Sequence, residues 1–227
     1  QSLALYVVAS IRRDTLRATE AGLKYFVLGA LSSGMLLYGC SLIYGFAGTT
    51  DFLGLAGIFS TLNGDVPVGL VFGMVFLIAG LAFKVSAVPF HVWTPDVYEG
   101  SPTTITAYLS VAPKAAGFAM LIRFFNQVFG DSSALVSESW QALNQIPWPQ
   151  LMGVLAAATM TVGNLVAIQQ KSVKRMLAYS SIAHAGYMMM ALPLMSEAGV
   201  YGIMMYLLMY LFMNLGAFFV VIYIQGK

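Results

Sequence analysis

The sequence contains few charged side chains. Lysine and arginine together number 11 and aspartate and glutamate 9, so 9% of the 227 residues are charged, whereas 59% are hydrophobic. Soluble domains carry about 25% charged residues, because a surface in water needs polar cover. The composition therefore excludes a soluble globular protein and places the chain in a lipid bilayer. A net charge of +2 gives no support for nucleic-acid binding.

Metal and redox ligands are also scarce. The sequence has one cysteine, Cys40, and two histidines, His91 and His184. A single cysteine cannot form an internal disulfide or hold an iron–sulfur cluster, and two histidines leave no ordinary metal cage. Neither phosphate-binding pattern, GxxxxGKS/T or GxGxxG, occurs in the sequence. We therefore expect no redox centre, cofactor or metal in this chain, and no ATP hydrolysis.

Long apolar runs dominate the sequence. A helix needs about 20 residues to cross the hydrocarbon core of a bilayer. By that criterion we expect a partial span over 1–11 and complete spans at about 21–47, 68–98, 103–129, 149–168, 173–195 and 199–224. These runs are apolar on all sides, which is typical of helices and not of the alternating segments of a membrane barrel. The predicted fold is a single all-α, polytopic transmembrane domain. Because the chain opens at Gln1 inside an apolar run, we expect it to be a fragment.

The loop charges predict the orientation of these spans, because basic residues are retained on the cytoplasmic side. One side is expected to hold Arg12, Arg13, Arg17, Lys24, Lys171, Lys174, Arg175 and Lys227. The other side is expected to hold Arg123 together with Asp51, Asp65, Asp131, Glu138 and Glu197. We predict that the first side is cytoplasmic and that the segment 130–147 faces the opposite way. Trp93, Trp140 and Trp148 fall at span ends and are expected to be interfacial anchors.

Two lysines, Lys84 and Lys114, lie near the middle of their expected spans, more than two turns from either end. A charge at that depth costs at least about 2.5–3.5 kcal/mol, so it is retained for a function or for an ion pair. Lysine suits proton transfer, because burial favours its neutral form and an approaching carboxylate restores the charged form. We predict a proton path through both residues, with a buried ion pair as the alternative.

Proline lies beside each of these lysines. Pro89 has no N–H for the carbonyl of Val85, so the span 68–98 is expected to break between Lys84 and Pro89. Pro113 likewise leaves the carbonyl of Leu109 without its donor, and a second structural break is expected there. Interrupted helices at membrane depth occur where they are buried in protein or line a wet cavity, which favours an ion path.

Three further ionisable residues are candidates. His184 lies in YSSIAHAGY, an unusually polar segment for a membrane span, and imidazole relays protons near neutral pH. A relay and an ordinary packing histidine both remain open for it. Asp96 and Glu99 follow the expected break in TPDVYEGSP, where the turn residues favour a loop-shaping or salt-bridging role over proton gathering.

Two strings carry a family resemblance. LAFKVSAVPFHVWTPDVYEGSPTTITAYLSVAPKAAGFAMLIRFF (81–125) and KSVKRMLAYSSIAHAGYMMMAL (171–192) closely resemble the antiporter-like membrane subunits of respiratory complex I. The VPFHVWTPDVYEGSP string resembles the subunit N family of NADH-quinone oxidoreductase and differs from its sister families L and M. The resemblance implies an antiporter-like helical bundle of about fourteen spans with two inverted repeats. This chain resembles a central fragment, about half of a family member.

The resemblance also implies roles for individual residues. Lys84 resembles the lysine of the first broken helix, Lys114 the central lysine one helix later, and His184 a member of the hydrophilic axis. The family's membrane glutamate is expected just before Gln1, and the second broken helix after Lys227. The implied function is proton translocation coupled to quinone reduction elsewhere, in a proton-pumping NADH:quinone oxidoreductase. Quinone, FMN, NADH and iron–sulfur clusters are expected in partner subunits. The expected neighbours in the membrane are other membrane-arm subunits, both antiporter-like and quinone-module.

Two other functions remain open at this stage. The chain could belong to a cation/proton antiporter, because such antiporters share the implied fold and both lysines suit either task. It could also be a non-conducting scaffold of the membrane arm, although Lys84 and Lys114 speak against this reading. The expected location is a bacterial inner membrane, with a thylakoid or mitochondrial inner membrane as the alternative.

Overall fold

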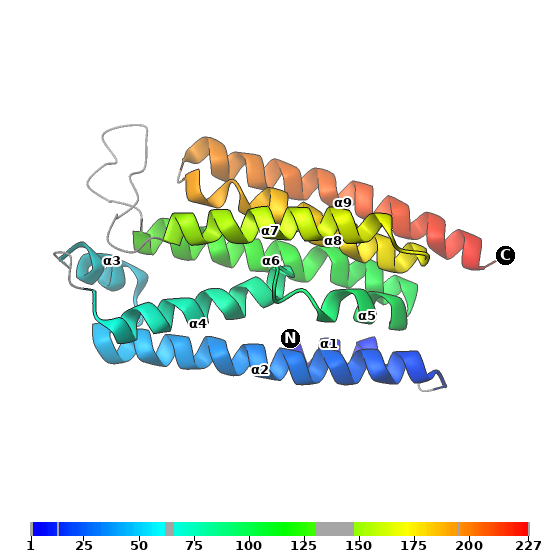
Figure 1. Ribbon diagram of the computed structural model, residues 1–227, viewed down its shortest axis with the longest axis horizontal. Helices are drawn as coiled ribbons and strands as arrows, with labels where there is room; N and C mark the ends of the chain where they lie inside the picture. Colours follow the sequence, from blue (N-terminus) through cyan, green and yellow to red (C-terminus); the bar gives the residue numbers. More distant parts are fainter. Residues whose placement is uncertain (1, 13, 62–65, 130–147, 195, 227) are drawn as a thin grey trace.

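The structure is a computed structural model that describes residues 2–12, 14–61, 66–129, 148–194 and 196–226. Within these ranges the chain forms helices and no strand. The α-helices are α1 (Ser2–Ala9), α2 (Leu16–Ala47), α3 (Phe52–Thr61), α4 (Val68–Val85), α5 (Trp93–Gly100), α6 (Thr103–Phe129), α7 (Trp148–Ile168), α8 (Val173–Met189) and α9 (Glu197–Gln225). A short 3₁₀ turn, Leu192–Leu194, follows α8. The long helices lie side by side along one axis (Figure 1).

Five of the described helices, α2, α4, α6, α7 and α9, are long and apolar enough to cross a membrane. The range 173–195, expected as one span, instead holds the 17-residue α8 followed by the 3₁₀ turn. Helix α3 was not expected, because its 10 residues fall below the length needed to span a bilayer. It lies at one end of the bundle, beside the end of α6 (Figure 1).

The predicted break in the span 68–98 is confirmed. Helix α4 ends at Val85, and Ser86 adopts a left-handed conformation with φ of 65°. The amide of Ser86 donates to the carbonyl of Phe83 (3.1 Å) and that of Ala87 to the carbonyl of Ala82 (2.8 Å), which caps the helix. The chain turns before Pro89 is reached, so the proline lies inside the break and α5 begins only at Trp93.

The break expected at Pro113 is wrong. Helix α6 runs without interruption from Thr103 to Phe129, with Pro113 inside it. A proline removes one hydrogen bond from a helix, but neighbouring helices can hold the segment together in a membrane bundle. Here α6 packs against α3, α4 and α9, which accounts for its continuity.

Small residues bring α2 and α4 into close contact. A Cβ atom on Gly39 would lie 2.7 Å from the carbonyl oxygen of Gly73, closer than two such atoms can approach. Glycine at both positions therefore lets the two backbones meet, as is common where helices pack in lipid. This packing fixes α4, and with it Lys84, against the longest described helix.

Two of the three tryptophans are buried, and their expected role as interfacial anchors is wrong. Trp148 is 1% exposed and stacks on Phe125 with ring centroids 4.3 Å apart. Trp93 is 3% exposed, stacks on Tyr25 at 4.6 Å and donates from Nε1 to the carbonyl of Phe83. Aromatic partners on neighbouring helices thus cover both rings. Trp140 lies outside the described residues.

Several of the described basic residues gather at one end of the bundle, called the basic end below, whereas Lys84, Lys114 and Arg123 lie elsewhere. It contains the start of α2, the end of α5, the turn between α7 and α8 and the end of α9 (Figure 1). Arg12, Arg17, Lys24, Lys174 and Arg175 belong to these segments. The opposite end contains α3 and the turn before α9 (Figure 1). The segment 130–147, Arg13 and Lys227 lie outside the described residues, and the cytoplasmic orientation remains a prediction.

Candidate functional site

Lys114 is enclosed by protein in the middle of α6. Its side chain is 1% exposed and points toward α8, where its ammonium nitrogen donates to the backbone carbonyl of Ser181 (2.8 Å) and to the Ser181 hydroxyl. No carboxylate among the described residues forms an ion pair with it. The ion-pair alternative is therefore unsupported here, and oxygen dipoles alone solvate this amine.

Ser181 is the centre of a buried hydrogen-bond network that joins four helices. The Tyr210 hydroxyl donates to Ser181 Oγ (2.7 Å), and Asn214 Nδ2 donates to the Tyr210 hydroxyl (3.1 Å). Asn214 Nδ2 also donates to Ser110 Oγ (2.6 Å), on the same helix as Lys114. The Tyr98 hydroxyl, from α5, lies 3.4 Å from Ser181 Oγ. These residues with Lys114 are called the Ser181 network; its members are Tyr98, Ser110, Lys114, Ser181, Tyr210 and Asn214.

Lys84 has different surroundings. It lies in the last turn of α4, one residue before the helix ends, next to the break that was expected to follow it. Its side chain is half-buried, and its ammonium nitrogen donates to Ser2 Oγ on α1 (2.9 Å). The residue lines a cavity of about 240 Å³, which also touches Ser2, Pro113 and Gly117. This cavity has room for several water-sized molecules.

The two lysines point to different partners. Lys84 binds α1, whereas Lys114 binds α8, and no hydrogen bond joins their amines among the described contacts. The helices themselves are close, because a Cβ on Gly117 would lie 3.7 Å from the Cβ of Lys84. Gly117 is one turn after Lys114 on α6. The cavity beside Lys84 therefore borders the helix that carries Lys114, although Lys114 itself does not line it.

His184 lies one turn after Ser181 on α8. Its Nδ1 atom is 2.6 Å from the Tyr206 hydroxyl of α9, and its ring centroid is 5.4 Å from that of Tyr210. Tyr187 flanks the other side at 5.8 Å and accepts a hydrogen bond from Asn164 Nδ2 on α7 (2.6 Å). The histidine is thus adjacent to the Ser181 network but has no described hydrogen bond to Lys114.

Sequence reasoning missed the contribution of α9. Tyr206, Tyr210 and Asn214 recur every four residues and so share one face of that helix, which meets α6 and the 3₁₀ turn after α8. The signal was available, because an asparagine in the apolar run MYLFMNLGAFF is costly unless it is hydrogen-bonded. Its partners, Ser110 and Tyr210, could be identified only from the fold.

Asp96 and Glu99 form ion pairs at the basic end, which confirms the salt-bridging role favoured for them. Asp96 is 2.7 Å from Lys24 of α2 and 2.7 Å from Arg175 of α8, and Glu99 is 3.1 Å from Arg175. Lys174 donates to the carbonyls of Ser101 (2.6 Å) and Glu99 (3.0 Å), which caps the end of α5. These contacts, called the ionic cluster, tie α5 to α2 and α8.

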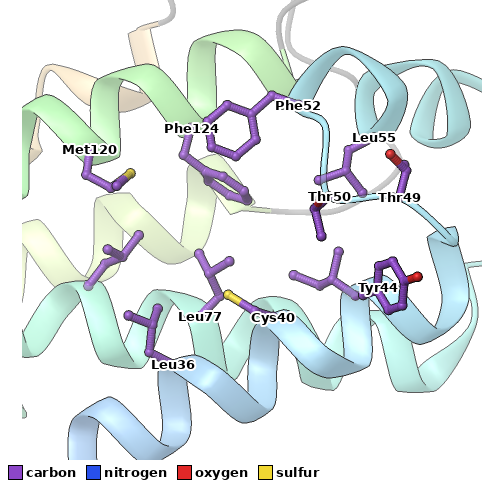
Figure 2. Close-up of a pocket in the computed structure, with 12 residues that line it drawn as sticks. Leu36, Cys40, Tyr44, Thr49, Thr50, Phe52, Leu55, Leu77, Met120 and Phe124 are labelled. Atoms are coloured by element: carbon purple, nitrogen blue, oxygen red, sulfur yellow. The ribbon is translucent and has the colours of Figure 1, made fainter.

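An apolar pocket of about 240 Å³ lies between α2, α3, α4 and α6 (Figure 2). Aliphatic and aromatic carbon forms most of its wall, with Leu36, Leu77, Met120 and Phe124 among its lining residues. Cys40 and Tyr44 supply the only ionisable side chains on the wall, and Cys40 is exposed. The lining of this pocket includes no carboxylate, imidazole, lysine or arginine side chain. The described residues also contain no group of three or more His, Cys, Asp or Glu able to hold a metal ion.

The helical bundle, the interrupted helix and the enclosed lysine define an antiporter-like membrane protein. The chain belongs to the family described as NADH:quinone oxidoreductase/Mrp antiporter, TM, whose model matches residues 1–227. NADH-quinone oxidoreductase subunit N of Rhodobacter capsulatus is 52% identical over 220 residues, which cover 96% of this chain and 43% of that protein. The chain therefore spans less than half the length of this relative.

Solved structures give the same result for the fold. A chain of respiratory complex I from Thermus thermophilus with bound aureothin has a TM-score of 0.75 at 38% identity, over 97% of this chain and 43% of that one. A chain of the Mrp complex from Dietzia sp. DQ12-45-1b has a TM-score of 0.80 at 23% identity, over 96% of this chain and 38% of that one. The first of these chains is similar to this chain in sequence and fold, whereas the second shows a similarity of fold alone.

Proposed function

We propose that this chain is part of a proton-translocating membrane subunit of an NADH:quinone oxidoreductase, of the subunit N type. The observation that supports the proposal most strongly is the enclosed position of the Lys114 side chain. It is buried in an apolar bundle without an ion-pair partner among the described residues, and its amine donates to the carbonyl and the hydroxyl of Ser181. An ionisable group in such a place is costly to retain and is a functional site by default.

The geometry supports a division of work among three residues. Lys84, beside a cavity at the end of a broken helix, exchanges its proton with water and responds to a carboxylate supplied by another segment. Lys114 holds a proton inside the bundle and passes it toward His184 and the helices beyond. Because Lys84 and Lys114 bind different elements, water in the cavity beside α6 has to bridge them. His184 takes part through its hydrogen bond with the Tyr206 hydroxyl.

The proposal also specifies the complex and the membrane in which this subunit works. Quinone reduction elsewhere in the complex drives the subunit, and the NADH, FMN, iron–sulfur clusters and quinone are held by partner subunits. In the membrane, the proposed neighbours of this chain are the other antiporter-like subunits and the quinone-module subunits. The membrane is the plasma membrane of a bacterium, as the bacterial relatives support.

A cation/proton antiporter subunit is the second candidate. The fold likeness to the Mrp complex favours it, but the sequence identity of 23% is well below the 52% identity to the subunit N relative. A non-conducting scaffold is disfavoured by the cost of keeping Lys114 enclosed.

Purification and proton pumping test the proposal together. The complete protein that carries this sequence is expected to copurify with NADH-oxidising, iron–sulfur subunits. In vesicles containing that complex, Lys84→Met and Lys114→Met should assemble, because methionine keeps an apolar side chain of similar length. Both should lower the ratio of protons moved to quinone reduced, since a positioned proton-transfer group typically contributes about 10²–10⁴-fold to the rate of its step.

Lys171→Met is the matched control, because Lys171 is exposed in the turn between α7 and α8 at the basic end. It should pump at the unaltered ratio. Full pumping by both buried-lysine variants would show that the lysines are structural charges. Copurification with antiporter subunits alone, together with sodium-dependent proton exchange, would instead favour the second candidate.

A further inference from the structure

We propose that Ser181 and Tyr98 form the route by which Lys114 exchanges its proton with the basic end, and that the arm formed by Tyr210, Asn214 and Ser110 only holds Ser181 in place. This inference rests on the proposed function and adds two residues to it. It starts from the hydrogen atoms available to the Ser181 hydroxyl, which has one hydrogen to donate and two lone pairs to accept.

Both lone pairs of Ser181 Oγ are occupied. One accepts a hydrogen from the Lys114 ammonium group, and the other accepts the phenolic hydrogen of Tyr210, whose oxygen lies 2.7 Å away. The single hydrogen of Ser181 is therefore left for its third oxygen neighbour, the Tyr98 hydroxyl at 3.4 Å. A proton that arrives from Lys114 can leave Ser181 only toward Tyr98.

The Tyr210 arm cannot carry that proton away. Tyr210 donates to Ser181 and accepts from Asn214 Nδ2, so its hydrogen already points at the serine. Behind it stands an amide nitrogen whose two hydrogens go to Tyr210 and Ser110. An amide N–H donates but has no lone pair with which to accept a proton. The arm therefore ends in the Asn214 amide nitrogen, which can only donate, and its role is to hold the Ser181 hydroxyl in place.

The transfer balances as follows. The Nζ–H bond of Lys114 breaks as Ser181 Oγ takes that proton, and the original Ser181 hydrogen passes to the Tyr98 oxygen. Tyr98, whose side chain is fully buried, gives its own phenolic hydrogen to a water molecule that has to enter from the basic end. Lys114 is left neutral, both hydroxyls are restored, and one proton has moved. The reverse sequence recharges Lys114.

Tyr98 is well placed to gate this route. Its distance of 3.4 Å from Ser181 exceeds the 2.5–3.0 Å of an ordinary O–H···O bond, so transfer needs the two oxygens to approach by about 0.5 Å. Tyr98 belongs to α5, which follows the break and is held at its far end by the ionic cluster. Asp96 and Glu99 of that cluster flank Tyr98, so a change in these ion pairs that moved α5 would open or close the contact with Ser181.

Tyr98→Phe and Tyr210→Phe are matched tests, because each removes one hydroxyl beside the same serine and keeps the buried ring. In vesicles with the assembled complex, Tyr98→Phe should lower the rate of proton transfer about tenfold or more, with quinone reduction retained. Tyr210→Phe should keep most of the pumping. Equal losses in the two variants, or full pumping by Tyr98→Phe, would overturn the assignment.

Variants of Ser181 test the same proton transfer between Ser181 and Tyr98. They also replace Tyr98→Phe as the test if that variant does not assemble. Ser181→Ala should pump as poorly as Tyr98→Phe, and Ser181→Thr should restore pumping because it returns a hydroxyl. Ser180→Ala, on the neighbouring residue, should have no effect. A failure of Ser181→Thr to exceed Ser181→Ala would contradict the route. If Lys114→Met pumps normally, the proposed function fails as well; if only the Tyr98 and Ser181 variants pump normally, this inference fails alone.

Discussion

Lys84 and Lys114 are 30 positions apart in the sequence and lie in neighbouring helices, yet their surroundings differ in almost every respect. Lys84 lies in the last turn of a helix, is half-buried, borders a cavity and has one hydroxyl partner. Lys114 sits inside a continuous helix, is 1% exposed and donates twice to one serine. The broken helix thus gives access to water, whereas the unbroken helix gives enclosure. A lysine that takes up protons from water needs the accessible environment of Lys84, and a lysine that holds a proton inside the bundle needs the enclosed environment of Lys114.

Arginine should separate the two lysines most strongly. Lys84→Arg is expected to assemble, because the cavity of about 240 Å³ beside Lys84 can accept the larger head group. Lys114→Arg is expected to assemble poorly, since a guanidinium has five donors and the enclosed site offers few acceptors. Neither variant should pump normally, because arginine stays charged throughout a cycle. The yield of assembled complex and its proton-to-quinone ratio measure the two effects. Equal assembly of both variants would contradict the contrast in enclosure.

A smaller effect is expected from the packing that fixes Lys84. Gly39→Ala places a Cβ 2.7 Å from the Gly73 carbonyl oxygen, so α2 and α4 must separate. Overpacking of this kind costs about 1–3 kcal/mol. The thermal midpoint of the purified protein in detergent should fall. Gly34→Ala on the same helix is the control, because nothing lies within 4 Å of its Cβ position, and an equal fall there would disprove the packing argument.

The smallest effect concerns the ionic cluster, which connects the Lys84 side of the bundle, through α2, with the Lys114 side, through α8. Asp96→Asn removes ion pairs to Lys24 and Arg175, each worth about 0.2–1 kcal/mol because the side chains are partly exposed. Glu20→Gln removes one exposed pair within α2, worth about 0.3–0.5 kcal/mol. The loss of thermal stability should therefore be larger for Asp96→Asn. The reverse order would show that the cluster does not join the two sides.

The sequence was sufficient for the class of fold and for the break. Composition required a membrane protein, and run lengths located the five long helices but neither α3 nor the end of α8. The resemblance of the Lys84 and Lys114 segments identified the family, which the comparisons confirm. The role of proline was less predictable. Pro113 lies in an unbroken helix because neighbouring helices support that helix. The break before Pro89 begins at Ser86, and no sequence motif predicted the left-handed conformation of this residue.

The surroundings of the lysines could not be predicted, because they depend on contacts between distant segments. Ser181 is 67 positions from Lys114, and Tyr210 of α9 donates to Ser181 from farther along the chain. Asn214 in an apolar run indicates a polar contact, but not that its partners are Ser110 and Tyr210. Trp93 and Trp148 show the same limit. Their positions at span ends suggest anchors, but the aromatic residues that bury them lie on other helices or farther along the chain.

A double variant tests most directly whether the two lysines serve one proton path. The ratio of protons moved to quinone reduced would be measured for Lys84→Met, Lys114→Met and the variant carrying both, in vesicles with equal amounts of assembled complex. If loading at Lys84 and storage at Lys114 are successive steps, the double variant will pump no less than the poorer single variant. A double variant whose loss equals the sum of two partial losses would show two independent routes and contradict the account.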